Sequence, residues 1–310
     1  MGLDPVPGPP FAFSLSETSI RYAAFARGDS GVELVEFQEV ALPPTAFGEG
    51  VLGPSLQEEG SLRAAIEELL SRLASPPDEA SLVVPDSWLR VVFTEAEELP
   101  RSAQERDEVL RWKLKRVVPF KVDKLRLRTL EVEPLAEQTA PHRLLLAFGA
   151  EALLSQIEAA FSAQGIRLGR ISNVSLSLLE AAWKSEGRDG TQAIVSANGG
   201  SYTIVFAAAG RPVLYRFKPL AEAGSSEALE RLVRRELRLT RTFVERHVGP
   251  PADTRMLLFA PAEQEAHWDG WLCEELGIGA VRRGSRLVDD ERVDAERIAP
   301  LLGAASALVA

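Results

Sequence analysis

Two stretches of this chain resemble each other at a constant spacing of 182 residues, and this internal repeat limits the folds available to it. Each stretch has the pattern of strand, tight turn, strand, glycine turn and strand, with apolar residues matching in between. Three pairs of residues coincide at this spacing: Ser14 with Ser196, Ser19 with Ser201, and Gly28 with Gly210. The repeat predicts two similar lobes that each begin with a β-meander. The alternative is a chance coincidence of glycines.

Both halves continue in the same way after the meander, with a helix and then a buried strand. In the first half, apolar residues fall on one helical face from Leu62 to Leu73, and residues 81–84 form a short apolar run. In the second half, residues 225–246 have a helical pattern and residues 255–259 an apolar one. The predicted meander strands are residues 11–15, 19–26 and 32–42 in the first half and 192–197, 202–208 and 212–217 in the second. This order of elements predicts an α/β fold with mixed sheets.

A different pattern interrupts the first half after Trp88. An alternating strand leads to a helix that Ser102 and Glu105 open as a capping box and that Pro119 ends. Two strands at 125–132 and 143–148 and a helix at 150–163 complete a small α+β subdomain. The predicted organisation is a disordered lead at 1–10, a first lobe at 11–86 and 172–183, an inserted subdomain at 87–171, a connection at 184–190 and a second lobe at 191–310.

The composition indicates a soluble globular chain and argues against several functions. The 310 residues contain no run of about 20 apolar residues, which a membrane-spanning helix needs, and the N-terminus lacks the pattern of a secretion signal. The net charge of −10 opposes non-specific binding to nucleic acid and to anionic lipid. Residues 111–124 are a basic exception, which we interpret as a solvated helix face.

Residue types that could carry catalysis or bind a metal do not cluster in the sequence. The histidines His142, His247 and His267 lack a metal-binding spacing, and we interpret them as surface or capping residues. Cys273 is the only cysteine, which excludes an internal disulfide and fits the reducing cytoplasm. We interpret it as a small core residue rather than a nucleophile. The sequence therefore predicts neither a catalytic residue nor a metal site.

The two meanders resemble the phosphate-binding hairpins of actin-like and Hsp70-like ATPases, in which facing lobes hold the nucleotide. That resemblance implies turns whose backbone N–H groups meet the phosphates and whose aspartates organise Mg²⁺ and water. The turn residues of this chain are Ser14, Ser16 and Ser19 in the first hairpin and Ser196, Asn198, Gly199, Gly200 and Ser201 in the second. Both aspartate positions hold serine, which lacks the charge that offsets Mg²⁺, and Ser16 replaces a glycine.

The third nucleotide element of such ATPases, a glycine pair after a core strand, is altered as well. Here the sequence is Phe259-Ala260-Pro261-Ala262-Glu263, and Pro261 has no N–H to donate. With all three elements changed, we expect no cofactor, and ATP with Mg²⁺ only if the degenerate cleft still binds it. The alternative is a divergent ATPase in which Glu17 or another acidic residue organises the metal.

Three short motifs in and just before the inserted subdomain are distinctive as a set. They are Leu82-Val83-Val84-Pro85-Asp86, Leu110-Arg111-Trp112, and Val117-Val118-Pro119-Phe120 with Asp123. Their order and spacing resemble those of the PilM family, actin-like cytoplasmic proteins of type IV pilus machines, and the resemblance extends over nearly the whole chain. It implies an actin-like, or ribonuclease-H-like, two-lobed α/β fold with a small α+β insertion in the first lobe.

The same resemblance implies a non-catalytic scaffold of the inner-membrane platform of a type IV pilus. The expected partner is the cytoplasmic N-terminal tail of a PilN-like membrane protein, bound in a groove between the first lobe and the insertion. The expected groove residues are Trp112, Val117, Pro119 and Phe120, and core packing is the alternative role for Trp112.

Pilus motor and platform proteins are further expected partners, whereas nucleic acid is not. The expected location is the cytoplasm, peripheral to the inner membrane through the partner and without direct membrane insertion. An adaptor of a type II secretion platform, similar to GspL, is the alternative function.

Overall fold

A computed structural model of the chain describes residues 9–28, 31–50, 53–116, 118, 121–135, 141–198, 200–220, 225–287 and 294–305. The described residues divide into two compact units. The C-terminal unit comprises Ser175–Gly303, and the N-terminal unit contains most of the described residues up to Val174. Large apolar cores fill both units, and the inserted subdomain has a third core of its own.

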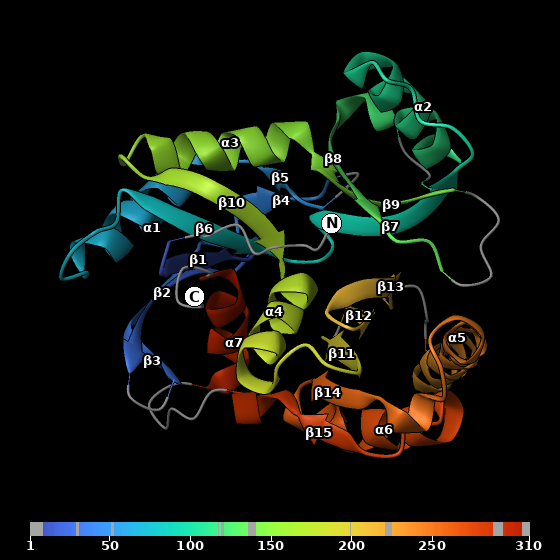
Figure 1. Ribbon diagram of the computed structural model, residues 1–310. Coiled ribbons are helices and arrows are strands. Elements are labelled where there is room, and N and C mark those ends of the chain that lie inside the picture. Colours follow the sequence, from blue (N-terminus) through green and yellow to red (C-terminus); the bar gives the residue numbers. More distant parts are fainter. Residues whose placement is uncertain are drawn as a thin grey trace. The chain divides into compact units, whose positions relative to one another are not determined.

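A five-stranded mixed sheet with the order β10-β6-β1-β2-β3 is the centre of the N-terminal unit (Figure 1). β1 pairs antiparallel with β2 and parallel with β6, and β6 pairs parallel with β10. The helices α1 and α3 contribute Leu62, Ile66, Ile157 and Phe161 to its core. The bounds are β1 (Phe11–Leu15), β2 (Ser19–Gly28), β3 (Gly31–Ala41), β4 (Phe47–Gly48), β5 (Ser55–Leu56), α1 (Glu59–Ser71), β6 (Glu79–Val84), α3 (Glu151–Ser162) and β10 (Arg167–Asn173).

The C-terminal unit contains a second five-stranded sheet, with the order β13-β12-β11-β14-β15. The helices α5 and α6 contribute Val233, Leu237 and Trp268 to the core of this unit. The bounds are α4 (Val174–Glu186), β11 (Thr191–Ala197), β12 (Ser201–Ala208), β13 (Arg211–Pro219), α5 (Ser226–His247), β14 (Arg255–Phe259), α6 (Ala262–Trp271), β15 (Val281–Arg283) and α7 (Ala295–Ala304). Short helical turns lie at Pro251–Asp253, Leu272–Leu276 and Gly284–Leu287.

The helices α4 and α7 pack against each other without room for a side chain at their contact. A Cβ atom added to Gly303 would lie 1.7 Å from the carbonyl oxygen of Ser177. The Nζ of Lys184 donates hydrogen bonds to the carbonyls of Leu302 at 2.6 Å and Gly303 at 3.1 Å. Glycine at this position therefore allows the close approach of the two helix backbones.

The repeat predicted from the sequence is present in the pairing of individual residues. Ser14 pairs with Arg21 in the first sheet, and Ser196 pairs with Thr203 in the second, which preserves the spacing of 182 residues. The register shifts recur at the same spacing, between Ala24/Phe25 in β2 and between Phe206/Ala207 in β12. The two strand orders also correspond element by element. The prediction of two copies is confirmed, and the alternative of coincident glycines is wrong.

A three-stranded antiparallel sheet and one helix form the inserted subdomain. The strand order is β7-β9-β8, and Leu110 and Leu114 of α2 pack in one core with Leu146 and Phe148 of β9. The Ser102 side chain accepts the N–H of Glu105 at the start of α2, as the predicted cap requires. The bounds are β7 (Leu89–Ala96), α2 (Ala103–Lys115), the 3₁₀ turn η1 (Val122–Lys124), β8 (Leu125–Val132) and β9 (His142–Ala150).

The end of the insertion differs from the prediction of residues 87–171. The helix α3 packs in the core of the five-stranded sheet, and β10 is the edge strand of that sheet. Both elements therefore belong to the lobe, and the insertion ends with β9 at Ala150. The periodicity of α3 predicts that one helix face is buried, but it does not predict which sheet covers that face.

The boundary between the two units also differs from the prediction. It falls between Val174 and Ser175, so the segment 172–183, predicted in the first lobe, lies mostly in the C-terminal unit. The segment 184–190, predicted as the connection, begins with the last turn of α4 and is inside that unit. Of the predicted disordered lead at 1–10, residues 1–8 lie outside the described residues, and the carbonyl of Pro10 accepts the N–H of Phe25.

Candidate functional site

The turn between β1 and β2 is closed by its own serine side chain. The Oγ of Ser16 accepts the N–H of Thr18 at 3.3 Å and that of Ser19 at 3.2 Å. The N–H of Ser16 donates to the carbonyl of Ser19 at 2.9 Å. The N–H groups of Ser16, Thr18 and Ser19 thus already have an acceptor within the turn. Ser14, at the expected aspartate position, is a strand residue of β1.

The turn between β11 and β12 is closed in the same way by an asparagine. The Oδ1 of Asn198 accepts the N–H of Gly200 at 2.9 Å and that of Ser201 at 2.8 Å. The N–H of Asn198 donates to the carbonyl of Ser201 at 2.9 Å. Ser16 and Asn198 are again 182 residues apart, so both halves use a side-chain oxygen at the same position of the repeat. Gly199 lies outside the described residues, and Ser196 is a strand residue of β11.

These residues do not fit a Mg²⁺-nucleotide group. Ser14 and Ser196 bring no negative charge, and the side chains of Ser16 and Asn198 each accept two N–H groups of their turn. Pro261 lies at the cap of α6 after β14 and has no N–H. Glu17 is exposed in the first turn. Within the described ranges, no group of three His, Cys, Asp or Glu residues is arranged to hold a metal ion.

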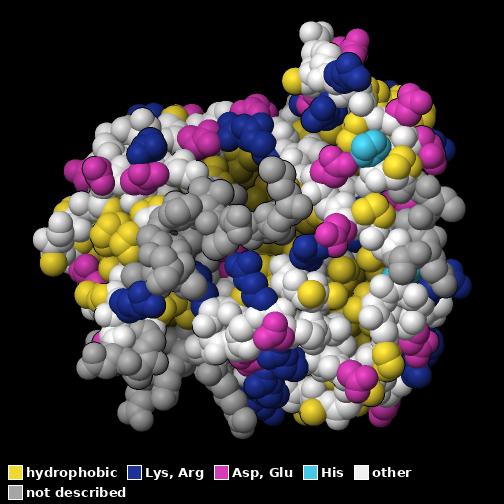
Figure 2. Space-filling model, in the orientation of Figure 1, with side chains coloured by type: hydrophobic (Ala, Val, Ile, Leu, Met, Phe, Trp, Pro, Cys, Tyr) yellow, Lys and Arg dark blue, Asp and Glu magenta, His cyan; other side chains and the backbone are white. Residues whose placement is uncertain are grey.

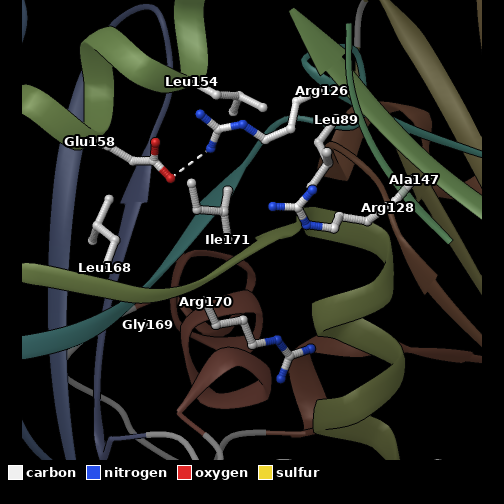
Figure 3. Close-up of a pocket in the computed structure, with 10 residues that line it drawn as sticks. All are labelled: Leu89, Arg126, Arg128, Ala147, Leu154, Glu158, Leu168, Gly169, Arg170 and Ile171. Atoms are coloured by element: carbon white, nitrogen blue, oxygen red, sulfur yellow. Dashed lines mark hydrogen bonds and ion pairs between the residues drawn. The ribbon is translucent and has the colours of Figure 1, made fainter. Parts of the chain in front are cut away.

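A groove of about 250 Å³ lies within the N-terminal unit, between the inserted sheet and the segment formed by α3 and β10 (Figure 3). Its apolar lining comes from Leu89, Ala147, Leu154, Leu168 and Ile171, and its polar lining from Arg126, Arg128, Glu158 and Arg170 together with Gly169. Figure 2 shows a hollow with apolar walls and basic side chains at its rim beside α3. Because β8 and β10 are edge strands of their sheets, one side of each backbone has no strand partner in the described part of the chain.

The alternation of β8 directs two arginines toward this groove. Leu125 and Leu127 pack into the core under α2. Because successive side chains of a strand point to opposite faces, Arg126 and Arg128 lie on the other face, where they line the groove. The same rule applies to β9, in which Leu146 and Phe148 face α2 while Ala147 lines the groove.

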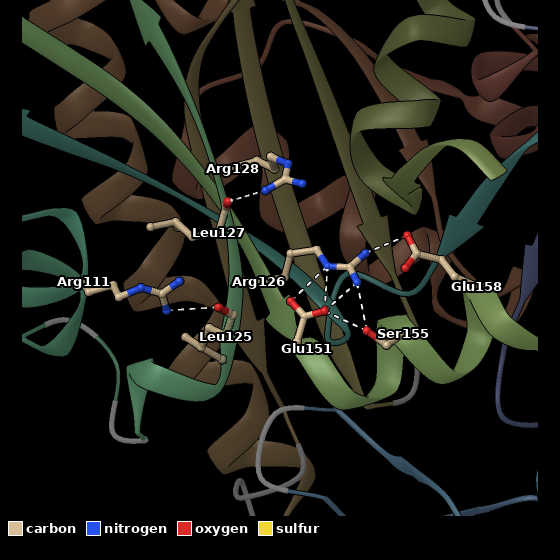
Figure 4. A network of polar contacts seen from close by, with 8 residues as sticks. All are labelled: Arg111, Leu125, Arg126, Leu127, Arg128, Glu151, Ser155 and Glu158. Carbon is tan, nitrogen blue, oxygen red and sulfur yellow. Dashed lines mark hydrogen bonds and ion pairs between the residues drawn. The ribbon is translucent and has the colours of Figure 1, made fainter. Parts of the chain in front are cut away.

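Arg126 is the centre of an ion-pair network that joins β8 to α3 (Figure 4). Its guanidinium donates to Glu151 at 2.6 Å, to Glu158 at 2.7 Å and to the Oγ of Ser155 at 3.1 Å. The hydrogen bonds from Arg126 and then from Ser155 lower the pKa of Glu151 to about 2, and the bonds from both carboxylates raise the pKa of Arg126. The positive charge of Arg126 is therefore paired with carboxylates of α3, and this pairing joins the inserted subdomain to the lobe.

Arg128 is the cation that remains available on the β8 side of the groove. Its side chain is exposed, and its guanidinium donates to the carbonyl of Leu127 at 3.1 Å. No carboxylate among the residues that the structure describes forms an ion pair with it. Arg170 lines the groove from β10 (Figure 3). An extended chain with an acidic or carbonyl-rich face would thus meet a positive wall and an apolar floor.

Of the groove residues predicted from the sequence, Trp112 is the one that the structure describes in full, and it does not line this groove. Trp112 lies on α2 and is 58% exposed, so the alternative of core packing is wrong, whereas its place in a partner groove stays a prediction. Val117, Pro119 and Phe120 lie outside the described residues. The sequence reasoning missed the arginines of β8, although the alternation Leu-Arg-Leu-Arg at 125–128 was the available signal.

The remaining candidate residues have individual surroundings. The Nδ1 of His142 lies 2.6 Å from a carboxylate oxygen of Glu131, and the ring of His247 packs on Phe243. Cys273 is exposed, so its predicted core position is wrong. Partial burial of the thiol, followed by the carboxylates nearby, raises the pKa of Cys273, which disfavours the nucleophilic thiolate at neutral pH. The described helices include none that is both long and apolar enough to cross a bilayer.

Comparison by sequence finds no matching protein-family model and no matching curated protein. Comparison of folds gives a clear result. The chain is similar to the structure entitled PilM-PilN type IV pilus biogenesis complex, with a TM-score of 0.70, 16% identity and coverage of 98% of both chains. The chain has the actin-like fold of PilM. A protein of unknown function with an actin-like ATPase fold from Bacteroides thetaiotaomicron is also similar, with a TM-score of 0.53, 9% identity and coverage of 97% of this chain and 99% of that one.

Proposed function

We propose that this chain is a non-catalytic scaffold of a type IV pilus inner-membrane platform, and that it binds the cytoplasmic tail of a PilN-like membrane protein. The observation that carries the proposal is the groove between the inserted sheet and the α3–β10 segment, in a chain that matches a PilM-PilN complex over 98% of its length. Pilus motor and platform proteins would be its further partners, and it would reach the inner membrane through the tail.

The groove has the features that an extended peptide requires. The strands β8 and β10 are the edge strands of their sheets among the described residues, and an extended peptide can add to a sheet edge as a further strand. Its apolar floor can accept alternate side chains, and Arg128 can pair with a carboxylate or a carbonyl of the peptide. Affinity would thus come from the backbone, and specificity from the floor and the cation.

The absence of catalysis is proposed from the two turns. Their N–H groups are bonded to Ser16 and Asn198, and the aspartates that would organise a metal are replaced by Ser14 and Ser196. A nucleotide would have to displace two internal acceptors and bind without a charge that offsets Mg²⁺. We therefore propose that the chain binds its partner without a nucleotide.

The test is calorimetric titration of the purified chain with synthetic N-terminal tails of candidate membrane partners. We expect binding that Arg128→Glu weakens at least 10-fold, which corresponds to the loss of one charge-assisted contact. Ala147→Leu should weaken it as well, because the larger side chain fills the groove. The matched control is Arg101→Glu, which makes the same charge change at an exposed position of the inserted subdomain that does not line the groove.

Two results would count against this function. If no tail binds, or if the control weakens binding as much as Arg128→Glu, the groove is not the binding site. If the chain hydrolyses Mg-ATP and Glu17→Gln abolishes the activity, the chain is the divergent ATPase instead. Tails from secretion-platform membrane proteins belong in the same titration, because a preference for them would favour the type II secretion adaptor.

A further inference from the structure

Positive side chains are concentrated near one exposed tryptophan, at the C-terminal end of α2 and in the adjoining turn η1. The indole of Trp112 is 58% exposed, and the guanidinium of Arg116 lies 5.3 Å from the ring centroid. Lys115, Lys121 and Lys124 are exposed. None of these three lysines forms an ion pair or a hydrogen bond with another described residue. We call these five residues the basic-tryptophan patch.

The neighbouring charges leave the patch positive. Two exposed carboxylates are close to it: Asp123 lies between the lysines of η1, and Glu108 lies one turn before Trp112 on α2. Arg111 is not available, because it is bonded to Asp107 and to the carbonyls of Val122 and Leu125. Lys113 donates to the carbonyl of Glu95. Four cations against two carboxylates therefore remain, which is a local positive excess in a chain whose overall charge is −10.

The basic-tryptophan patch differs from the basic surface of α5 in whether its charges are paired within the protein. The helix α5 also carries an exposed apolar side chain, Leu239, which is 52% exposed among many arginines. There, however, the arginines are paired: Arg234 and Arg238 with Glu275, and Arg235 with Glu236. Charges that are already paired within the protein contribute little to the binding of a partner. The charges of the basic-tryptophan patch are not paired in this way with any described residue.

We propose that the basic-tryptophan patch adsorbs to an anionic lipid bilayer. Lysine and arginine beside lipid phosphates gain electrostatic free energy, and a tryptophan indole favours the boundary between headgroups and acyl chains. Lysine can keep its ammonium at the phosphates while its stem contacts the apolar region. The net negative charge of the chain opposes this contact weakly, because charges beyond about 8 Å are screened at physiological ionic strength.

This inference goes beyond tail binding and does not depend on it. The patch and the groove belong to the same compact unit but share no residue. Substitutions in the patch should therefore leave the affinity for a tail peptide unchanged, and substitutions in the groove should leave the affinity for lipid unchanged.

The test is flotation of the full chain with vesicles of phosphatidylcholine containing about 40% phosphatidylglycerol, a fraction chosen to give a strongly negative surface, against vesicles of phosphatidylcholine alone. We expect binding to the anionic vesicles only. Each lysine should contribute about five-fold to partitioning, so Lys115→Gln/Lys121→Gln/Lys124→Gln should reduce it on the order of 100-fold. The control Arg231→Gln/Arg235→Gln/Arg238→Gln removes the same charge from α5 and should leave binding within about two-fold of the wild type.

Brominated anionic lipid gives a second readout that reports on Trp112 itself. The lipid should quench part of the tryptophan fluorescence in the wild type, and Trp112→Phe should abolish that quenching while circular dichroism confirms the fold. The proposal is overturned if the anionic vesicles do not bind, or if the triple lysine variant binds as the wild type does. It is also overturned if polyglutamate binds the patch and vesicles do not, since the partner would then be an acidic protein.

Discussion

A single methyl group at the contact of α4 and α7 should destabilise the C-terminal unit. Gly303→Ala places a Cβ atom 1.7 Å from the carbonyl oxygen of Ser177, about half of an ordinary contact distance. The obstacle is backbone, so no rotamer change relieves it. The helices must separate, although Ile298 and Leu301 of α7 are fully buried and Lys184 bonds to the carbonyls of Leu302 and Gly303.

The expected loss follows from two opposing contributions. Overpacking of a rigid contact costs about 3 kcal/mol at the upper end of its usual range. The better helix propensity of alanine returns about 1 kcal/mol. The net loss is therefore about 2 kcal/mol, which lowers the melting temperature of a unit of this size by roughly 8 °C.

The measurement is hydrogen exchange of peptides from α4 and α7, which isolates this unit in a chain of two units, together with thermal unfolding. Gly270→Ala in α6 is the matched control, because a Cβ there meets nothing within 4 Å. It should stabilise the unit by about 0.5–1 kcal/mol. The reasoning about the contact is refuted if Gly303→Ala changes stability by less than about 0.5 kcal/mol, given the cost that overpacking implies.

Three further predictions concern the turns, the network and α2. Asn198→Ala and Ser16→Ala each leave two N–H groups without their acceptor and should cost about 0.5–1 kcal/mol in urea unfolding, whereas Asn198→Asp keeps the acceptor and should cost less. The pKa of Glu151 is lowered to about 2 in the folded state, so its contribution is present above its ordinary pKa and is lost as pH falls toward 2. Because that side chain is 49% exposed, Arg126→Gln should cost only about 1 kcal/mol at pH 7, and the difference from the wild type should shrink between about pH 4.5 and pH 2 in acid titrations followed by circular dichroism. Leu110→Ala should cost about 2–4 kcal/mol because Leu110 is 2% exposed, whereas Trp112→Ala should stay within about 0.5 kcal/mol; equal losses in thermal unfolding would contradict the burial of α2.

The sequence predicted the meander strands of the two sheets because their determinants are local. Alternating apolar residues, turn glycines and a constant spacing specify each meander, and the registers of β1–β2 and β11–β12 agree with that spacing. Gly210 illustrates the reason: it adopts a φ of 73° in the turn after β12, a conformation that side chains disfavour. A conformational requirement of this kind depends on one residue, so it can be predicted without knowing which distant residues that position contacts.

The insertion boundary and the groove depended on distant contacts. The apolar face of α3 is compatible with either neighbouring sheet, and only the packing of Ile157 and Phe161 decides between them. The groove needs Arg128 of β8 and Ile171 of β10 on facing elements, and no periodicity relates residues 43 positions apart. The alternative of core packing for Trp112 fails for a related reason, since Leu110 and Leu114 fill the core under α2.

The internal acceptors of the two turns bear on what could control the timing of partner binding and release. A hairpin with free N–H donors becomes ordered when a phosphate binds and loses that order when the phosphate leaves. Through this change, hydrolysis of a nucleotide can time the assembly and disassembly of a complex. In the hairpins closed by Ser16 and Asn198, two N–H groups of each turn already have an acceptor without a ligand. On the proposed function, occupancy of the groove would therefore follow the concentration of the partner and its rate of dissociation, and assembly would be reversible by mass action.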